Sequence, residues 1–340
     1  MCKRYLGLLL TLTLLLSACQ SLTPSNTRDS APLQIAYVPL LGFAPLFVAA
    51  DKGYFAEQGL QVELQRVRNP DEMLAPLSTG KVDISLMAVT TGFFNGMNQK
   101  LDFRVVAGAD AAVGTKGNPF LVVSKTLSES GAVRKVADLK GRKLAINLRG
   151  SALEYMLGKG LEQAGLTLDD VELVTIPGTE AQVAIANGAV AGAAVGALNA
   201  QRMIKDGVAV SLLADADVLR GGQGGVVVFG QRLLQPTNRD VAIRVLAAYL
   251  KAVRELNDGG WQDPKIVSIL QKYTEMEPAL IERSAKPTYI ADGTLDEASI
   301  QDIQAFQIKR GYVEYKTALS VAQMANLTFV SEAVARLKQK

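Results

Sequence analysis

Hydrophobic and polar residues follow two different periods near the start of the chain. Residues 33–40 form a short apolar segment that predicts a strand, and residues 45–52 begin with proline and continue as an apolar run typical of a helix. Gly53 and Gly59 are expected to end this helix and the single turn after it, because glycine readily adopts the left-handed conformation. Apolar and polar residues then alternate over 60–65, which predicts a half-buried strand. A strand–helix–strand unit of this kind favours a parallel sheet covered by helices.

The same pattern occurs a second time further along the chain. Three pairs of segments correspond in the same order, and the matched positions lie 106 to 109 residues apart: 33–47 with 142–156, 55–64 with 161–174, and 77–91 with 185–199. This repetition predicts two lobes of like topology. Extended segments at 115–125 and 221–231 would carry the chain from one lobe to the other and back, and two such crossovers form a natural hinge. Two independent domains joined by an ordinary linker are the alternative.

We therefore expect an α/β protein with two lobes, each with a parallel-rich sheet flanked by helices. The expected divisions are a signal peptide at 1–18, a tether at 19–32, lobe 1 at 33–118 plus 227–340, and lobe 2 at 119–226. Helical periodicity dominates the last hundred residues, and helices are predicted at 236–256, 264–273, 278–284 and 296–309.

The N-terminal residues indicate export. Lys3 and Arg4 precede the apolar segment 5–16, which is shorter than the roughly 20 residues needed to span a bilayer, so a secretory signal is predicted. The sequence "LSAC" that ends at Cys19 resembles the lipobox of bacterial lipoproteins, which implies that this cysteine carries a diacylglyceryl group. Two or more acyl chains give stable anchoring. An ordinary signal peptide with an unrelated cysteine is the alternative. The polar residues 20–31 would form a flexible tether.

The composition excludes several classes of function. The chain has no histidine and two cysteines, of which Cys2 would be lost with the signal and Cys19 would carry lipid. Catalysis by histidine or a thiol, a histidine metal site and a disulfide are then not expected. The net charge is +3 without a basic stretch, so nucleic acid is not an expected partner. No phosphate loop of the form GxxxxGK[ST] is present, and no cofactor is expected.

Four segments taken together carry a resemblance to a known family: "GFAPLFVAADKGYFAEQGLQVEL", "LSTGKVDIS", "VADLKGRKLAINLRGSALEYML" and "AIANGAVAGAAV". Their order resembles that of the periplasmic solute-binding proteins of ABC importers, in the subgroup for sulfonates, taurine, nitrate and thiamine pyrimidine precursors. The resemblance implies a hinged two-lobed fold, the type II periplasmic binding protein, which closes on a small solute. It also implies delivery to a membrane permease with a separate ATPase subunit. An extracytoplasmic, lipid-anchored monomer without enzymatic activity is expected.

Candidate ligand-binding residues follow the carboxyl ends of the predicted strands, where open α/β sheets bind ligands. In lobe 1 they are Tyr37, Leu41, Gly42, Phe43, Thr90, Thr91 and Asp110. In lobe 2 and the second crossover they are Asn147, Arg149, Gly150, Ser151, Tyr155, Asn199 and Gln223.

These residue types suggest individual roles. Phe43 and Tyr155 could stack on a flat ring, and Gly150 with Ser151 opens a helix whose N-terminus suits an anion or a carbonyl. Arg149 could add a bidentate contact. Each role has a structural alternative: Phe43 in the core, Arg149 facing water, and Asp110, expected just after a strand, capping a turn.

The expected ligand follows from the few charges in these loops. Arg149 is the obvious cation there. A single positive charge is little to bind a dianion with, but it is adequate for a carbonyl-rich ring. Sulfonate-binding relatives often carry an aromatic residue and an acid–proline pair where this chain reads "VGALNAQ". A vitamin-like heterocycle, either a thiamine pyrimidine precursor or riboflavin, is therefore favoured. A sulfonate, taurine or nitrate importer component and a solute-sensing lipoprotein are the alternatives. A related branch of the fold synthesises the thiamine pyrimidine with a histidine and a cysteine-rich iron motif, which this chain lacks.

Overall fold

The computed structural model describes residues 31–111, 119–219, 222–284 and 286–338. The described residues from Leu33 onward belong to one compact unit. The predicted signal peptide, Cys19 and most of the predicted tether lie outside the described residues. In the described part of the chain, no helix is both long and apolar enough to cross a membrane.

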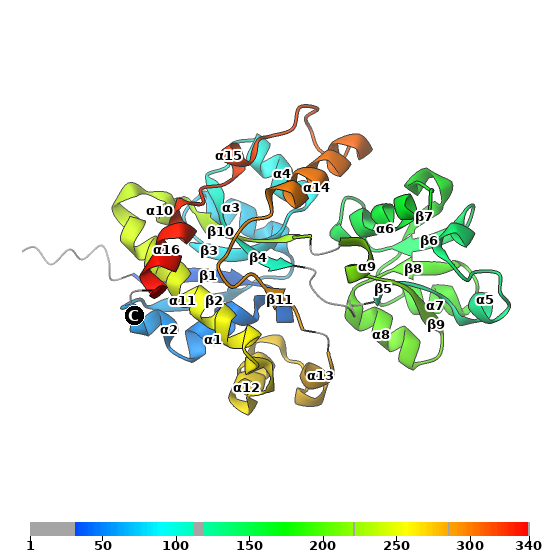
Figure 1. Cartoon of the computed structure of the whole chain (residues 1–340), viewed down its shortest axis with the longest axis horizontal. Coiled ribbons are helices and arrows are strands. Elements are labelled where there is room, and N and C mark those ends of the chain that lie inside the picture. The colour runs from blue at the N-terminus through cyan, green and yellow to red at the C-terminus, as the bar shows by residue number, and fades with distance from the viewer. Residues whose placement is uncertain (1–30, 112–118, 220–221, 285, 339–340) are drawn as a thin grey trace, which may run out of the picture. The chain divides into compact units, whose positions relative to one another are not determined.

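The first sheet is mixed. Among the described residues it has six strands in the order β11-β4-β10-β3-β1-β2 (Figure 1). Their bounds are β1 Leu33–Tyr37, β2 Val62–Arg66, β3 Ile84–Ala88, β4 Phe103–Ala111, β10 Gly225–Gly230 and β11 Thr288–Tyr289. β1 is parallel to β2 and β3, whereas β10 runs antiparallel to β3 and β4.

The second sheet repeats this arrangement. Its five described strands have the order β7-β6-β8-β5-β9. They are β5 Pro119–Ser124, β6 Lys143–Ile146, β7 Glu172–Thr175, β8 Gly192–Ala194 and β9 Ala209–Ala214. β6 is parallel to β7 and β8, as β1 is to β2 and β3, and β5 is antiparallel to β8 and β9. The chain leaves the first sheet after β4 and returns to it at β10. The α/β class with two sheets flanked by helices is confirmed.

Helices connect the strands of both sheets and form most of the C-terminal part (Figure 1). Up to β10 they are α1 Ala44–Asp51, α2 Tyr54–Glu57, α3 Leu74–Ser78, α4 Thr91–Asn98, α5 Lys125–Glu129, α6 Ala152–Gln163, α7 Ala181–Ala186, α8 Ala197–Lys205 and α9 Asp215–Leu219. After β10 they are α10 Gln231–Leu234, α11 Arg239–Asn257, α12 Pro264–Thr274, α13 Pro278–Arg283, α14 Glu297–Arg310, α15 Val321–Met324 and α16 Thr328–Lys338. The long α11 packs against α1 and α16 beside the first sheet.

The sequence pattern correctly predicts where the first helix and the turn after it end. Gly53 has a φ of 79° and Gly59 a φ of 69°, so both adopt the left-handed conformation that ends the preceding turn.

One prediction about a strand end is wrong. Asp110 lies inside β4, opposite Gly225 of β10, rather than after the strand, since the pairing of β4 with β10 continues to that position.

The two faces of the second sheet are both buried. Leu121 and Leu144 belong to a hydrophobic cluster with α6, whereas their neighbours Val122 and Ala145 belong to a second cluster with α7 and α8. Successive side chains of a strand point to opposite faces, so a continuous apolar run is what a sheet covered on both sides requires.

A buried ion pair ties α10 to the first sheet. Asp83 precedes β3 and is completely buried, and it accepts a hydrogen bond of 2.7 Å from the backbone N–H of Gln34. Arg232 of α10 donates to both carboxylate oxygens through its Nε and a terminal nitrogen. Such a bidentate pair compensates the cost of burying the carboxylate only while both partners are present.

Candidate functional site

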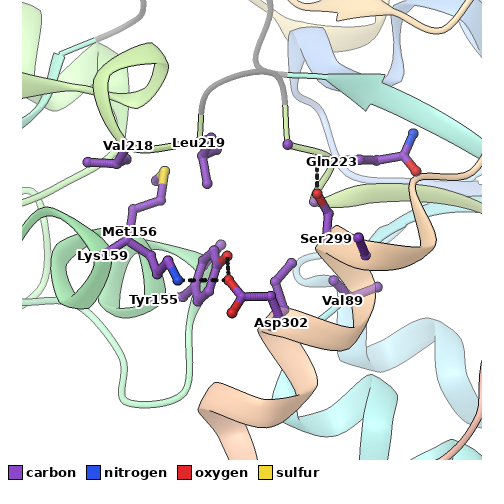
Figure 2. A pocket seen from close by; sticks show the side chains of 14 residues that line it. Val89, Tyr155, Met156, Lys159, Val218, Leu219, Gln223, Ser299 and Asp302 are labelled. Carbon is purple, nitrogen blue, oxygen red and sulfur yellow. Dashed lines mark hydrogen bonds and ion pairs between the residues drawn. The ribbon is translucent and has the colours of Figure 1, made fainter. Parts of the chain in front are cut away.

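A pocket of about 290 Å³ lies between α6, α9, the segment before β10, and α14 (Figure 2). Its lining residues are Val89, Ala152, Tyr155, Met156, Lys159, Val218, Leu219, Gly222, Gln223, Gly224, Ala298, Ser299, Asp302 and Ile303. Val89 directly follows β3, and Ala152 is the first residue of the helix after β6. The pocket therefore lies beside the carboxyl ends of parallel strands from both sheets, where ligands bind in open α/β folds.

One face of α6 forms a wall of the pocket. Its lining residues occupy positions i, i+3, i+4 and i+7 of the helix, which share one side: Ala152, Tyr155, Met156 and Lys159. Ser151 is the N-cap, and its side chain accepts a hydrogen bond of 3.3 Å from the backbone N–H of Glu154. Tyr155 and Gln223 are the predicted site residues that line this pocket.

The opposite wall is the first part of α14. Asp296 is its N-cap and accepts a hydrogen bond of 3.1 Å from the N–H of Ser299. Gln223 holds this helix start in place, because its Oε1 accepts from the N–H of Asp296 at 2.9 Å and its own N–H donates to Ser299 Oγ at 3.2 Å. The predicted residue Gln223 therefore shapes the pocket by fixing α14.

An ionic cluster joins the two walls. Tyr155 OH donates to Asp302 Oδ2 at 2.6 Å, and Lys159 Nζ lies 3.0 Å from the same oxygen. Figure 2 shows both side chains pointing from α6 toward Asp302 on α14. Burial alone would raise the pKa of Asp302, but the hydrogen bonds from Tyr155 and Lys159 lower it below its ordinary value. Burial and the neighbouring carboxylate raise the pKa of the Tyr155 hydroxyl. At neutral pH the tyrosine is therefore a donor and Asp302 is ionised.

Most of the remaining lining is apolar. It comes from Val89, Met156, Val218, Leu219 and Ile303, together with the small side chains of Ala152 and Ala298. A concave, mostly apolar site with a few convergent polar groups is typical of small-molecule binding. No group of three or more Asp, Glu, His or Cys residues in the described part of the chain could hold a metal ion.

The loop before α6 contacts α4 and α14 next to this pocket. Gln307 of α14 donates from its Nε2 to the carbonyl of Gly150 at 2.9 Å, and Thr91 Oγ1 donates to Gln307 Oε1 at 2.7 Å. Gly150 has a φ of 71°, and a Cβ atom there would lie 2.2 Å from Thr91 Oγ1. Glycine is therefore required at this contact, and the structure brings the predicted residues Thr91 and Gly150 together.

The predicted anion site at the start of α6 is filled from within the protein. The fully buried carboxylate of Glu154 accepts from the N–H of Gly150 at 2.6 Å and from Tyr312 OH at 2.6 Å. Arg149 turns toward this carboxylate at 3.4 Å and donates to the carbonyl of Leu173 at 2.8 Å. The N–H of Gly150 is therefore already bonded to Glu154 one turn further along, and an anion or carbonyl at the start of α6 stays a prediction that cannot count on this donor.

The other predicted residues of the first lobe do not line the pocket. Phe43 is buried in the hydrophobic core, and Tyr37 packs edge-on against Phe47. The carbonyl of Leu41 accepts a hydrogen bond of 2.8 Å from Tyr289 OH, and Gly42 follows in the same short 3-10 turn. Thr90 caps α4 by accepting from the N–H of Phe93 at 3.3 Å.

Asp110 is the most constrained of these residues. The N–H of Gly225 donates to its carboxylate, and burial raises its pKa. Its Oδ1 has no contact with solvent and no hydrogen-bond partner among the described residues. In the second lobe, Asn147 is exposed, and Asn199 lies partly buried in the first turn of α8.

Sequence reasoning missed two groups of lining residues. Met156 and Lys159 could have been found, because helical spacing puts them on the same face as Tyr155. Ser299 and Asp302 gave no comparable signal, since only the packing of α14 against α6 brings them to the site.

Comparisons with known proteins identify the class of this fold. Residues 26–267 match the NMT1-like family, and the chain belongs to it. The crystal structure of the periplasmic aliphatic sulphonate binding protein SsuA from Escherichia coli superposes with a TM-score of 0.71 at 19% identity, covering 87% of this chain and 92% of that one. The fold is that of a type II periplasmic binding protein.

Two curated relatives of this chain carry names that refer to different solutes. The nitrate import ATP-binding protein NrtC of Synechococcus elongatus is 28% identical over 71% of this chain, but the match spans 37% of that relative's length. The riboflavin-binding protein RibY of Chloroflexus aurantiacus is 25% identical over 74% of both chains.

Proposed function

We propose that this protein is the solute-binding component of an ABC importer and that its solute binds in the pocket between α6 and α14. The observation that carries this proposal is the place of the pocket, beside strand ends from two sheets that the chain connects through two crossovers. Closure of such a hinge around a ligand is an established use of this topology. Membership of the NMT1-like family and the fold shared with a sulphonate binding protein support it.

The proposed solute is a small vitamin-like heterocycle, either a thiamine pyrimidine precursor or riboflavin. The ring of Tyr155 and the apolar lining suit a flat molecule, and RibY is named as a riboflavin-binding protein. The volume of about 290 Å³ lies at the small end of the range of roughly 300–1,000 Å³ found for ligand pockets, which favours the pyrimidine. Sulfonate or nitrate is the second candidate, because the NrtC and SsuA relatives carry those names.

The remaining parts of the proposal concern location and partners. A lipid on Cys19 would hold the protein at the outer face of a membrane, and a permease with its ATPase subunit would receive the solute. The protein would act as a monomer and without catalysis. The complete absence of histidine supports a binding role over the histidine-dependent synthesis of the thiamine pyrimidine.

Mass spectrometry of small molecules released by denaturing the purified full-length protein tests this function. Ala298→Phe would fill the pocket from the first turn of α14, so the released compound should be lost. Ala305→Phe is the matched control, because Ala305 is exposed on the same helix outside the pocket. If both variants release equal amounts of the compound, the binding site lies elsewhere. If the wild type releases no compound that it can bind again, the binding role is refuted.

A further inference from the structure

Two ionised side chains of opposite sign lie side by side in the pocket. Lys159 and Asp302 come from different walls, and Lys159 Nζ lies 3.0 Å from Asp302 Oδ2. The carboxylate of Asp302 therefore balances the charge of the lysine within the site. Glu162 lies 3.6 Å from the same ammonium group, so the surroundings of Lys159 carry more negative than positive charge. The pocket therefore offers no net attraction to an anion.

Both side chains keep capacity for a ligand. The contacts from Tyr155 and Lys159 go to Asp302 Oδ2, and no described residue donates to Asp302 Oδ1. The side chain of Asp302 is 49% exposed, and that of Lys159 is 30% exposed. An ammonium group has three N–H donors, so Lys159 can hold Asp302 and still donate to a ligand. The pocket wall thus presents an acceptor, Asp302 Oδ1, next to a donor, the ammonium group of Lys159.

The other polar side chains at this wall are already engaged. Gln223 accepts from the N–H of Asp296 and donates to the carbonyl of Thr294 at 3.4 Å. Ser299 Oγ donates to Asp296 Oδ2 at 2.5 Å while accepting from the N–H of Gln223. Polar recognition by side chains falls to Asp302 and Lys159.

We propose that Asp302 and Lys159 determine the specificity of the pocket, and that its ligand is an uncharged nitrogen heterocycle with an N–H donor next to an acceptor atom. The ligand N–H would bind Asp302 Oδ1, and the neighbouring ring nitrogen or carbonyl would accept from Lys159. Nitrate and simple alkanesulfonates carry acceptor atoms alone and would face the carboxylate without a proton to share, so the pocket rejects them. This inference rests on the proposed binding function and names the chemistry of its solute.

Calorimetric titration of the full-length protein tests the inference with four probes: 4-amino-5-hydroxymethyl-2-methylpyrimidine, riboflavin, ethanesulfonate and nitrate. We expect one of the two heterocycles to bind the wild type, and neither anion to do so. Asp302→Asn keeps the size of the side chain but removes its charge, so heterocycle affinity should fall by about tenfold or more. Lys159→Met keeps the apolar stem and should weaken binding in the same direction.

Two controls separate recognition from a loss of contact between the walls. Tyr155→Phe removes the hydroxyl that joins α6 to Asp302 but keeps the carboxylate and the ring, so it should weaken binding less than Asp302→Asn. Asp258→Asn changes an exposed aspartate after α11, away from the pocket, and should have no effect.

The outcomes distinguish the two proposals. A heterocycle that binds wild type and Asp302→Asn equally well, or an equal loss in Tyr155→Phe and Asp302→Asn, would overturn this inference and leave the binding function standing. Binding of ethanesulfonate or nitrate by the wild type would overturn it in the same way. If no probe binds and no compound is released from the protein, the proposed function fails and the inference fails with it.

Discussion

The contact between Gly150 and Thr91 allows a quantitative test of how the loop before α6 meets the first lobe. Gly150→Ala introduces a Cβ atom at a residue whose φ is 71°, which costs about 1–2 kcal/mol for an L-residue in the left-handed region. The same atom would lie 2.2 Å from Thr91 Oγ1, so the threonine must move. Its single O–H donates to Gln307 Oε1 at 2.7 Å, and the Gly150 carbonyl at 3.3 Å is the weaker alternative acceptor, so the threonine would lose one hydrogen bond, worth about 1 kcal/mol.

Gly141 provides a matched control for the backbone part of this cost. Its φ is 72°, and no atom lies within 4 Å of the position of an added Cβ. Gly141→Ala should therefore report the conformational cost alone, about 1–2 kcal/mol. The free energy of unfolding, measured by urea denaturation, should fall about 1 kcal/mol further in Gly150→Ala than in Gly141→Ala.

A double-mutant cycle then assigns the difference to Thr91. Thr91→Ala removes the hydroxyl that an alanine at 150 would displace, so the double variant should lose that hydrogen bond once rather than twice. The two substitutions should deviate from additivity by about 1 kcal/mol, above the roughly 0.5 kcal/mol seen for independent sites. Equal costs for Gly141→Ala and Gly150→Ala, together with additive single variants, would refute the contact.

Two further predictions concern folding and anchoring. Arg232→Met should lower the free energy of unfolding by about 3–5 kcal/mol, because it leaves the completely buried Asp83 carboxylate without its partner, and a matched Arg283→Met at the end of α13 should cost far less by the same urea assay. Cys19→Ala should abolish lipid attachment, read as the mass of the mature protein, while ligand binding stays unchanged; a lipidated Cys19→Ala protein would refute the lipobox interpretation.

The sequence alone determined the local structure of this protein. Gly53 and Gly59 end their turns because few other residues adopt a positive φ at low cost, and helical periodicity predicted 296–309 where α14 spans Glu297–Arg310. The internal repeat also anticipated the like strand orders around β1 and β6. The glycine turns and the helix depend on residues near one another in the chain, so their physical causes are visible in the sequence, whereas the strand orders were inferred from the repeat.

Tertiary packing alone decided the chemistry of the site. Tyr155 meets Asp302 across 147 residues of sequence, and no periodicity of either helix specifies that partner. Packing also brings Glu154 to the N–H of Gly150 at the start of α6 and Arg149 to the carbonyl of Leu173. A buried carboxylate is stabilised by whichever donors the folded chain brings to it, and those donors come from the loop before α6 and from Tyr312 after α14. The ligand-binding groups of this protein are thus a consequence of how α14 packs on α6.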